Sequence, residues 1–138
     1  MTTMVNEYEI LNQVIQFIEE KLFDENLTVQ NAADYVKINS KVLAEIFTRN
    51  KLPNPCRYIA LRRIEELEKE IIILHKNGEP VKSAHLAKYV GYSSMAHLNN
   101  RLNSVLGFSY TELKNIVINN FKSGKQPVFK TKFPRNFI

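Results

Sequence analysis

The chain is poor in cysteine, in glycine and in long apolar runs. Its 138 residues include one cysteine, Cys56, so no disulfide can form within the chain, and we expect a reducing, cytoplasmic environment. The four glycines fit neither a phosphate-binding loop nor a dinucleotide fingerprint. The longest strongly apolar run covers residues 71–74. A membrane span needs about 20 such residues, so we expect none. These absences leave a small helical binding module or a small enzyme that lacks a familiar motif.

Side chains that carry catalysis or bind metals are scattered. The three histidines, His75, His85 and His97, lack the spacing of metal ligands, and Cys56 lies far from all of them in the sequence. No paired carboxylates and no Ser–His or Cys–His pair occur in a context that indicates an active site. We therefore expect a binding protein without catalytic residues, metal or cofactor.

Charge is unevenly distributed along the chain. The formal net charge is +5, and residues 119–138 alone contribute +5 without an acidic residue. Residues 80–114 carry a net +3, whereas residues 1–79 carry −3. A basic C-terminal half favours an anionic partner such as a nucleic acid or a membrane surface, and the alternative is a solvated tail that aids solubility. A run of opposite charges in the centre of the chain is expected to form ion pairs on a helix surface, namely Arg62, Arg63, Glu65 and Glu66.

Apolar residues recur every three or four positions through most of the chain, which predicts helices and no strand of length. Thr28, Asn39 or Ser40, and Ser93 or Ser94 can cap helix N-termini. The expected helices cover residues 7–22, 28–36, 40–51, 56–77, 81–90, 94–106 and 110–121. The predicted fold is all-α, with about seven helices and a basic, irregular C-terminal tail.

Residues 27–51 and 81–106 repeat one arrangement. Each segment begins with a short helix that contains a small residue, Ala33 or Ala87, and continues through a short turn into a second, capped helix. This arrangement is typical of a helix-turn-helix, in which the second helix enters the DNA major groove. We therefore divide the chain into a first helix-turn-helix subdomain (1–55), a linker helix (56–78), a second subdomain (79–118) and a basic tail (119–138).

The second repeat contains three motifs in order, LAKYVGYS at residues 86–93, HLNNRL at 97–102 and LGFSYTELK at 106–114. The first repeat matches at spaced positions, namely Leu43, Ile46, Phe47, Pro55, Tyr58, Ile59, Arg63 and Ile64. From residue 7 to about residue 118, this order and spacing resemble the DNA-binding domain of the AraC family of bacterial transcription regulators. The chain departs from the family pattern at Leu52, where glycine is usual, at Asn103, where lysine is frequent, and at Tyr110, where proline is frequent.

The resemblance implies sequence-specific binding of double-stranded DNA by a cytoplasmic, nucleoid-associated transcription regulator, with two recognition helices in successive major grooves. It also implies recruitment of RNA polymerase, by a monomer on DNA or by part of a longer dimeric regulator, and a structural role for Arg63. The length of the linker helix is compatible with this geometry. About 20 residues span roughly 30 Å, against about 34 Å between successive major grooves on one side of DNA.

Outward-facing positions of the two second helices are the candidate DNA contacts. In the first helix they are Ser40, Lys41, Ala44, Glu45, Thr48 and Arg49. In the second they are Ser94, Ala96, Asn99, Asn100, Arg101 and Asn103. Lys41 and Arg49 can bind phosphates or guanine, the asparagines can pair with adenine, and Ala96 can contact a thymine methyl group. The alternative is that these are solvated helix faces and that the serines are plain N-caps.

A second hypothesis is a protein-interaction module on a helix-turn-helix scaffold, with polymerase or another regulator as its partner and only weak DNA binding. Glu45 in the first recognition helix and the missing lysine at Asn103 favour it. The tail, with Phe129, Phe133 and Phe137 at every fourth position, would then anchor the partner. A third hypothesis assigns the tail to a membrane surface.

Overall fold

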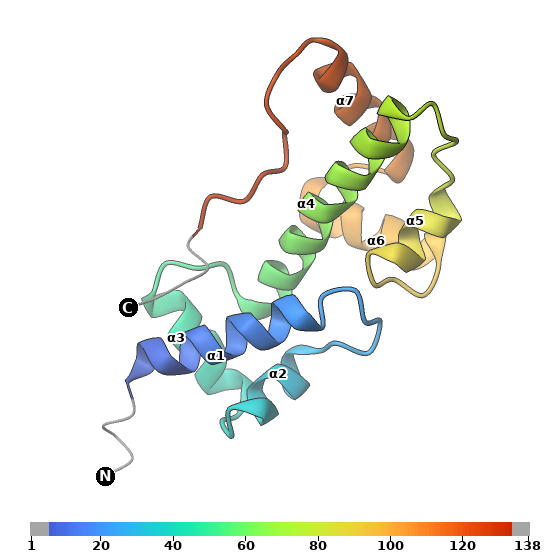
Figure 1. The fold of residues 1–138 in the computed structure, drawn as a ribbon. Helices are drawn as coiled ribbons and strands as arrows, with labels where there is room; N and C mark the ends of the chain where they lie inside the picture. Colours follow the sequence, from blue (N-terminus) through green and yellow to red (C-terminus); the bar gives the residue numbers. More distant parts are fainter. Residues whose placement is uncertain (1–5, 134–138) are drawn as a thin grey trace. The chain divides into compact units, whose positions relative to one another are not determined.

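The computed structural model describes residues 6–133, and over this range the chain is all-α, as predicted. Seven helices follow one another without a strand in the described part (Figure 1). They are α1 (Glu7–Glu20), α2 (Val29–Tyr35), α3 (Ser40–Arg49), α4 (Pro55–Lys76), α5 (Ser83–Tyr89), α6 (Met95–Leu106) and α7 (Tyr110–Lys122). Within residues 6–133, every helix is too short or too polar to span a lipid bilayer.

The described residues form two compact units. Unit 1 contains residues 6–22, 26–59 and 132–133, and unit 2 contains residues 23–25 and 60–131. Helix α4 therefore contributes its first turn to unit 1 and the rest of its length to unit 2. The four-segment division expected from the sequence follows motifs rather than packing, and it stays a prediction.

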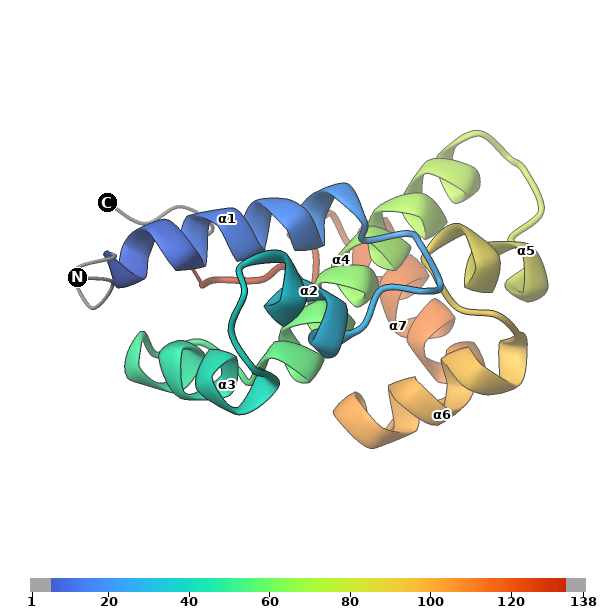
Figure 2. The same ribbon diagram turned by 90° about the horizontal axis from the view of Figure 1, so that it is seen from below.

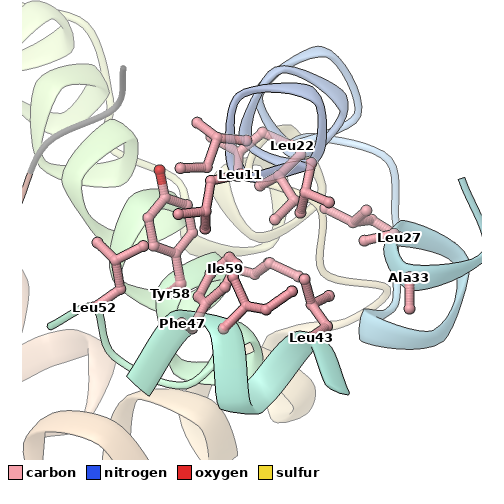
Figure 3. Close-up of a cluster of buried hydrophobic side chains, with 14 residues drawn as sticks. Leu11, Leu22, Leu27, Ala33, Leu43, Phe47, Leu52, Tyr58 and Ile59 are labelled. Atoms are coloured by element: carbon pink, nitrogen blue, oxygen red, sulfur yellow. The ribbon is translucent and has the colours of Figure 1, made fainter. Parts of the chain in front are cut away.

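In unit 1, helices α1, α2 and α3 enclose an apolar core (Figure 3). Figure 2 shows α1 along one side of this unit and α3 along the other, with α2 between them. Thr28 caps α2 by accepting from the backbone N–H of Asn31 at 3.1 Å, and Asn39 caps α3 by accepting from Val42 at 2.8 Å. The cap of α3 is thus Asn39 and not Ser40, which is the first residue of the helix. The buried core residues include Leu11, Val14, Ile18, Ala33, Leu43, Phe47 and Tyr58.

In unit 2, residues 60–76 of α4 pack with α5, α6 and α7 around a second core. Ser94 caps α6 by accepting from the backbone N–H of His97 at 3.1 Å. Ser109 and Glu112 form a reciprocal capping box at the start of α7. Between these helices, Gly107 ends α6 in the left-handed conformation (φ 77°), which glycine adopts without a steric penalty. The buried core residues include Ile64, Leu67, Ile71, Leu86, Ala87, Leu98, Leu102 and Leu113.

The predicted repeat is present as the same helix pair in each unit. The backbone N–H of Ile38 donates to the carbonyl of Ala33 at 3.1 Å, and that of Tyr92 donates to Ala87 at 2.9 Å. Both alanines are fully buried, so their size lets the two helices of each pair approach closely. Each turn contains one residue of positive φ, which is Lys37 (62°) in unit 1 and Gly91 (93°) in unit 2.

The departure at Leu52 has a structural explanation. Glycine is favoured where a helix ends in a left-handed residue, but here Lys51 takes that conformation (φ 60°). Leu52 follows it, donates its backbone N–H to the carbonyl of Phe47 at 3.0 Å and is 6% exposed. The side chain at position 52 is therefore buried in the core of unit 1, and the left-handed conformation falls on Lys51.

The central helix forms ion pairs, as expected, but the expectation that they lie on its surface is wrong. Arg62 and Glu65 are only 3% and 5% exposed, and Arg62 Nη1 lies 2.6 Å from Glu65 Oε1. Arg62 Nη1 also lies 3.2 Å from Glu66 Oε2. Arg63 is buried as well, and its guanidinium donates to the carbonyl of Asp24 at 2.8 Å and stacks 5.0 Å above the ring of Tyr92. Arg63 is thus buried against Asp24 and Tyr92, whereas Glu65 is covered by another segment of the chain.

That covering part is the chain after α7, residues 123–133, which we call the C-terminal strap. It is irregular, as predicted, and in Figure 1 its red segment runs back beside α4. The Glu68 carboxylate, 1% exposed, accepts the backbone N–H groups of Val128 and Phe129, each at 2.8 Å. Thr131 Oγ1 donates to Glu65 Oε1 at 2.7 Å.

Two of the three phenylalanines named above in the basic tail lie in the strap and pack within the chain. Phe129 packs on the core of unit 2, with its ring 6.5 Å from that of Phe108. Phe133 packs on the core of unit 1, with its ring 4.8 Å from that of Tyr58. Phe137 lies outside the described residues. Because both rings pack within the chain, the structure argues against their use as an anchor for a partner or a membrane.

Candidate nucleic-acid interface

The exposed face of α3 presents polar side chains one turn apart. Lys41, Glu45 and Thr48 are exposed and recur at helical spacing, whereas Ser40 and Ala44 are half-buried. Thr48 Oγ1 donates to the carbonyl of Ala44 at 3.0 Å, so its hydroxyl is turned back onto its own helix. The face combines one cation, one anion and one hydroxyl, and it can offer both donors and acceptors to a base edge.

Arg49, the last residue of α3, is exposed but ion-paired. Its Nη2 and Nε donate to Glu7 Oε1 at 2.7 and 3.2 Å, and Asn50 Nδ2 donates to Glu7 Oε2 at 2.8 Å. The hydrogen bond from Arg49, and then that from Asn50, lowers the pKa of the Glu7 carboxyl below its usual value. A carboxylate with a lowered pKa keeps its partners at neutral pH, and these contacts are lost as the pH falls through that pKa.

The exposed face of α6 is uncharged. Ala96, Asn100 and Asn103 are exposed and lie one turn apart, so a methyl group and two amides share one face. Ser94 is exposed and its hydroxyl is used as the helix cap. Arg101 is half-buried and interacts within the chain. This face suits adenine and thymine edges rather than phosphates.

Asn99 has a different position from the other predicted contacts on α6. It is half-buried, and its Oδ1 accepts the backbone N–H of Tyr110 at 2.8 Å. This bond joins the middle of α6 to the first residue of α7. The side chain is therefore occupied within unit 2, where it ties two helices together.

Asn99→Ala is expected to lower the free energy of unfolding by about 1.5 kcal/mol, because the N–H of Tyr110 loses its acceptor. Urea denaturation measures the difference. Asn100→Ala is the matched control, since it makes the same exchange one residue further along α6 at an exposed position. Equal stability of the two variants would show that the bond to Tyr110 contributes nothing.

Two exposed residues on α6 were not predicted from the sequence. His97 is exposed one turn before Asn100, with its ring 5.1 Å from that of Tyr92 and its Nδ1 3.4 Å from Ser93 Oγ. Ser104 is exposed one turn after Asn100. Both lie at helical spacing from Asn100, so the periodicity that selected Asn100 was the signal for them too.

Side chains of the kinds that bind metal ions do not cluster in the part of the chain that the structure describes. Within residues 6–133, no group of three or more His, Cys, Asp or Glu side chains is placed to hold a metal ion. The candidate interface therefore consists of helix faces that can contact a partner by hydrogen bonds, charge and apolar contact.

No family model and no curated protein sequence matches the chain. Among solved structures, the C-terminal domain of AraT, a response regulator from Geobacillus stearothermophilus, superposes with a TM-score of 0.65. The two chains share a fold. The likeness covers 78% of this chain and 84% of the AraT domain at 14% sequence identity. The arrangement of helices in this chain thus also occurs in a domain of a response regulator.

Proposed function

We propose that the chain is a transcription regulator that binds double-stranded DNA in a sequence-specific manner, with α3 and α6 each in a major groove. The observation that carries this proposal is the duplicated helix pair, whose second helix exposes a polar face in each unit. The fold shared with a response-regulator domain supports it. Membership of the AraC family, a bacterial origin and a nucleoid-associated, cytoplasmic location belong to the same proposal.

The two recognition helices would read DNA differently. On α6, Asn100 and Asn103 would pair with adenine edges, and Ala96 would contact a thymine methyl group. On α3, Lys41 would bind a phosphate or guanine, and Glu45 would accept from a cytosine amino group. We expect α6 to contribute more to sequence preference and α3 to combine base and backbone contacts. Ser40, Ala44, Thr48, Ser94 and Arg101 are the remaining proposed contacts on these helices besides Arg49, whereas Asn99 is already bound to Tyr110.

Regulation would follow from binding next to a promoter and recruiting RNA polymerase. The protein would act as a monomer on DNA or as part of a longer dimeric regulator. The 22 residues of α4 correspond to roughly 33 Å of helix, close to one turn of DNA. We therefore expect two half-sites about one turn apart.

The test is selection of random duplex DNA by the purified chain at two salt concentrations, followed by sequencing of the retained fragments. The proposal predicts an enriched motif of two short half-sites. It also predicts that the logarithm of the affinity falls linearly with the logarithm of the salt concentration, with a slope of about −0.9 for each phosphate neutralised. Retention without an enriched motif would contradict sequence-specific binding.

Asn100→Ala is expected to weaken binding to the selected site by about tenfold and to relax the preference for adenine at one position of one half-site. Titrations against the selected site and single-base variants measure both effects. The matched control is Asn115→Ala, an exposed asparagine on α7 of the same unit. Equal weakening on every duplex would instead assign Asn100 to the DNA backbone.

A second candidate function is a protein-interaction module with weak DNA binding. It is favoured by the uncharged face of α6 and by the neutralisation of Arg49 by Glu7. Such a module would show little affinity for any duplex at moderate salt. The same salt titration therefore separates the two functions.

A further inference from the structure

The three-residue contact of Glu7, Arg49 and Asn50 connects the first turn of α1 to the end of α3 within unit 1. Asn50 is held on both sides, because its Nδ2 donates to Glu7 Oε2 and to the carbonyl of Ile46, each at 2.8 Å. The Glu7 carboxylate therefore has one oxygen fixed by Asn50 and presents the other to Arg49. Glu7 lies more than 40 residues from Arg49 in the sequence, and no motif signals the contact.

Arg49 retains one unused edge in this arrangement. A guanidinium has five N–H groups arranged along two edges that can each bind an oxyanion. Glu7 occupies the edge formed by Nε and Nη2. Among the described residues, no hydrogen bond engages Nη1, and the side chain is 58% exposed. The edge formed by Nη1 and Nη2 thus remains available to solvent or to a second oxyanion.

We propose that Glu7 is a positioning residue that holds Arg49 so that its Nη1 edge donates to a DNA phosphate beside the groove occupied by α3. This inference rests on the proposed DNA-binding function and adds to it a residue outside both helix-turn-helix motifs. Phosphate, rather than a base, is the expected ligand because Arg49 is the last residue of α3. Base edges are read mainly by the N-terminal residues of a recognition helix.

Two opposing effects decide the sign of the contribution of Glu7. Ordering a long side chain before binding improves affinity by roughly two- to tenfold. The carboxylate would lie about 7 Å from the phosphate, and in water this repulsion weakens binding by about threefold or less, and by less again when salt screens it. Salt screens both this repulsion and the exposed ion pair that orders Arg49, so the net benefit of Glu7 should change little with salt concentration.

The test is a double-mutant cycle in DNA affinity with Glu7→Ala, Arg49→Ala and the double variant, measured on one duplex at two salt concentrations. Glu7→Ala is expected to weaken binding about threefold near physiological salt, and not to weaken it in the Arg49→Ala background, where only the repulsion from Glu7 is relieved. Arg49→Ala should also reduce the slope of log affinity against log salt by about 0.9. Glu9→Ala is the matched control, because it removes an exposed carboxylate from the same first turn of α1.

Three outcomes would overturn the inference. Tighter binding by Glu7→Ala than by Glu9→Ala would mean that Glu7 competes with phosphate for Arg49. An equal loss with and without Arg49 would assign Glu7 a merely structural role, which thermal denaturation of each variant would also reveal. Unchanged binding would mean that Arg49 needs no support. Failure of the proposed function is distinguishable, because the unaltered chain itself would then show no salt-dependent binding to duplex DNA.

Discussion

Replacement of Glu68 by alanine is expected to lower the free energy of unfolding by about 3 kcal/mol. The carboxylate is 1% exposed and accepts two consecutive backbone N–H groups of the C-terminal strap, those of Val128 and Phe129. Its removal leaves two donors without their acceptor at a partly buried position and opens space beneath the strap. Urea denaturation followed by circular dichroism measures the loss.

The control for this prediction is Glu79→Ala, which removes an exposed glutamate from the loop after α4. Its free energy of unfolding should change by less than about 0.5 kcal/mol. If Glu68→Ala is as stable as Glu79→Ala, the strap does not depend on Glu68. If Glu68→Ala is destabilised as expected, the strap is part of the fold. A loss of DNA binding after deletion of the tail then cannot be assigned to the lysines of the tail, because the deletion also destabilises unit 2.

Gly91→Ala is expected to cost about 3 kcal/mol of stability, from two independent sources. The backbone at Gly91 has φ 93°, and a left-handed conformation costs an L-residue roughly 1–2 kcal/mol. An added Cβ would also lie 2.9 Å from the Arg63 guanidinium. Arg63 cannot move freely, because it donates to the carbonyl of Asp24 at 2.8 Å and stacks on the ring of Tyr92.

The matched control is Gly78→Ala, at a glycine with φ 69° where an added Cβ would meet nothing within 4 Å. Its free energy of unfolding should fall only by the conformational term, about 1–2 kcal/mol. The difference between the two variants, measured by thermal or urea denaturation, isolates the contact with Arg63. Equal destabilisation would show that Arg63 moves aside without cost, contrary to the structural role that its resemblance to a family arginine implies.

Features with a local cause were predictable from the sequence. The seven helices, the caps at Thr28 and Ser94 and the repeat centred on Ala33 and Ala87 depend on residues within one or two turns of one another. Helical periodicity and capping preferences act over that range, so a single sequence contains the whole signal.

Features that depend on distant parts of the chain were not predictable. The Arg62–Glu65 pair has the spacing of a surface ion pair, but it is buried, and the strap that contacts Glu65 lies more than 60 residues later in the sequence. Asn99 has the helical position of a base contact, but a backbone N–H on the next helix engages its side chain. The contact of Glu7 with Arg49 has no sequence signal at all, because it depends on how α1 crosses α3. Each case is a tertiary contact that overrides an interpretation based on periodicity.

The strap also has a consequence for how the protein folds. Glu68 and its partner Val128 are 60 residues apart, so the ribosome makes the acceptor long before the donors. Until the donors arrive, an ionised carboxylate stays solvated, because burying it alone is costly. Unit 2 is therefore expected to finish folding only after its last residues emerge, and contacts of such high sequence separation slow that step. In refolding experiments, protection of the Val128 and Phe129 amides from hydrogen exchange should appear after that of α5 and α6.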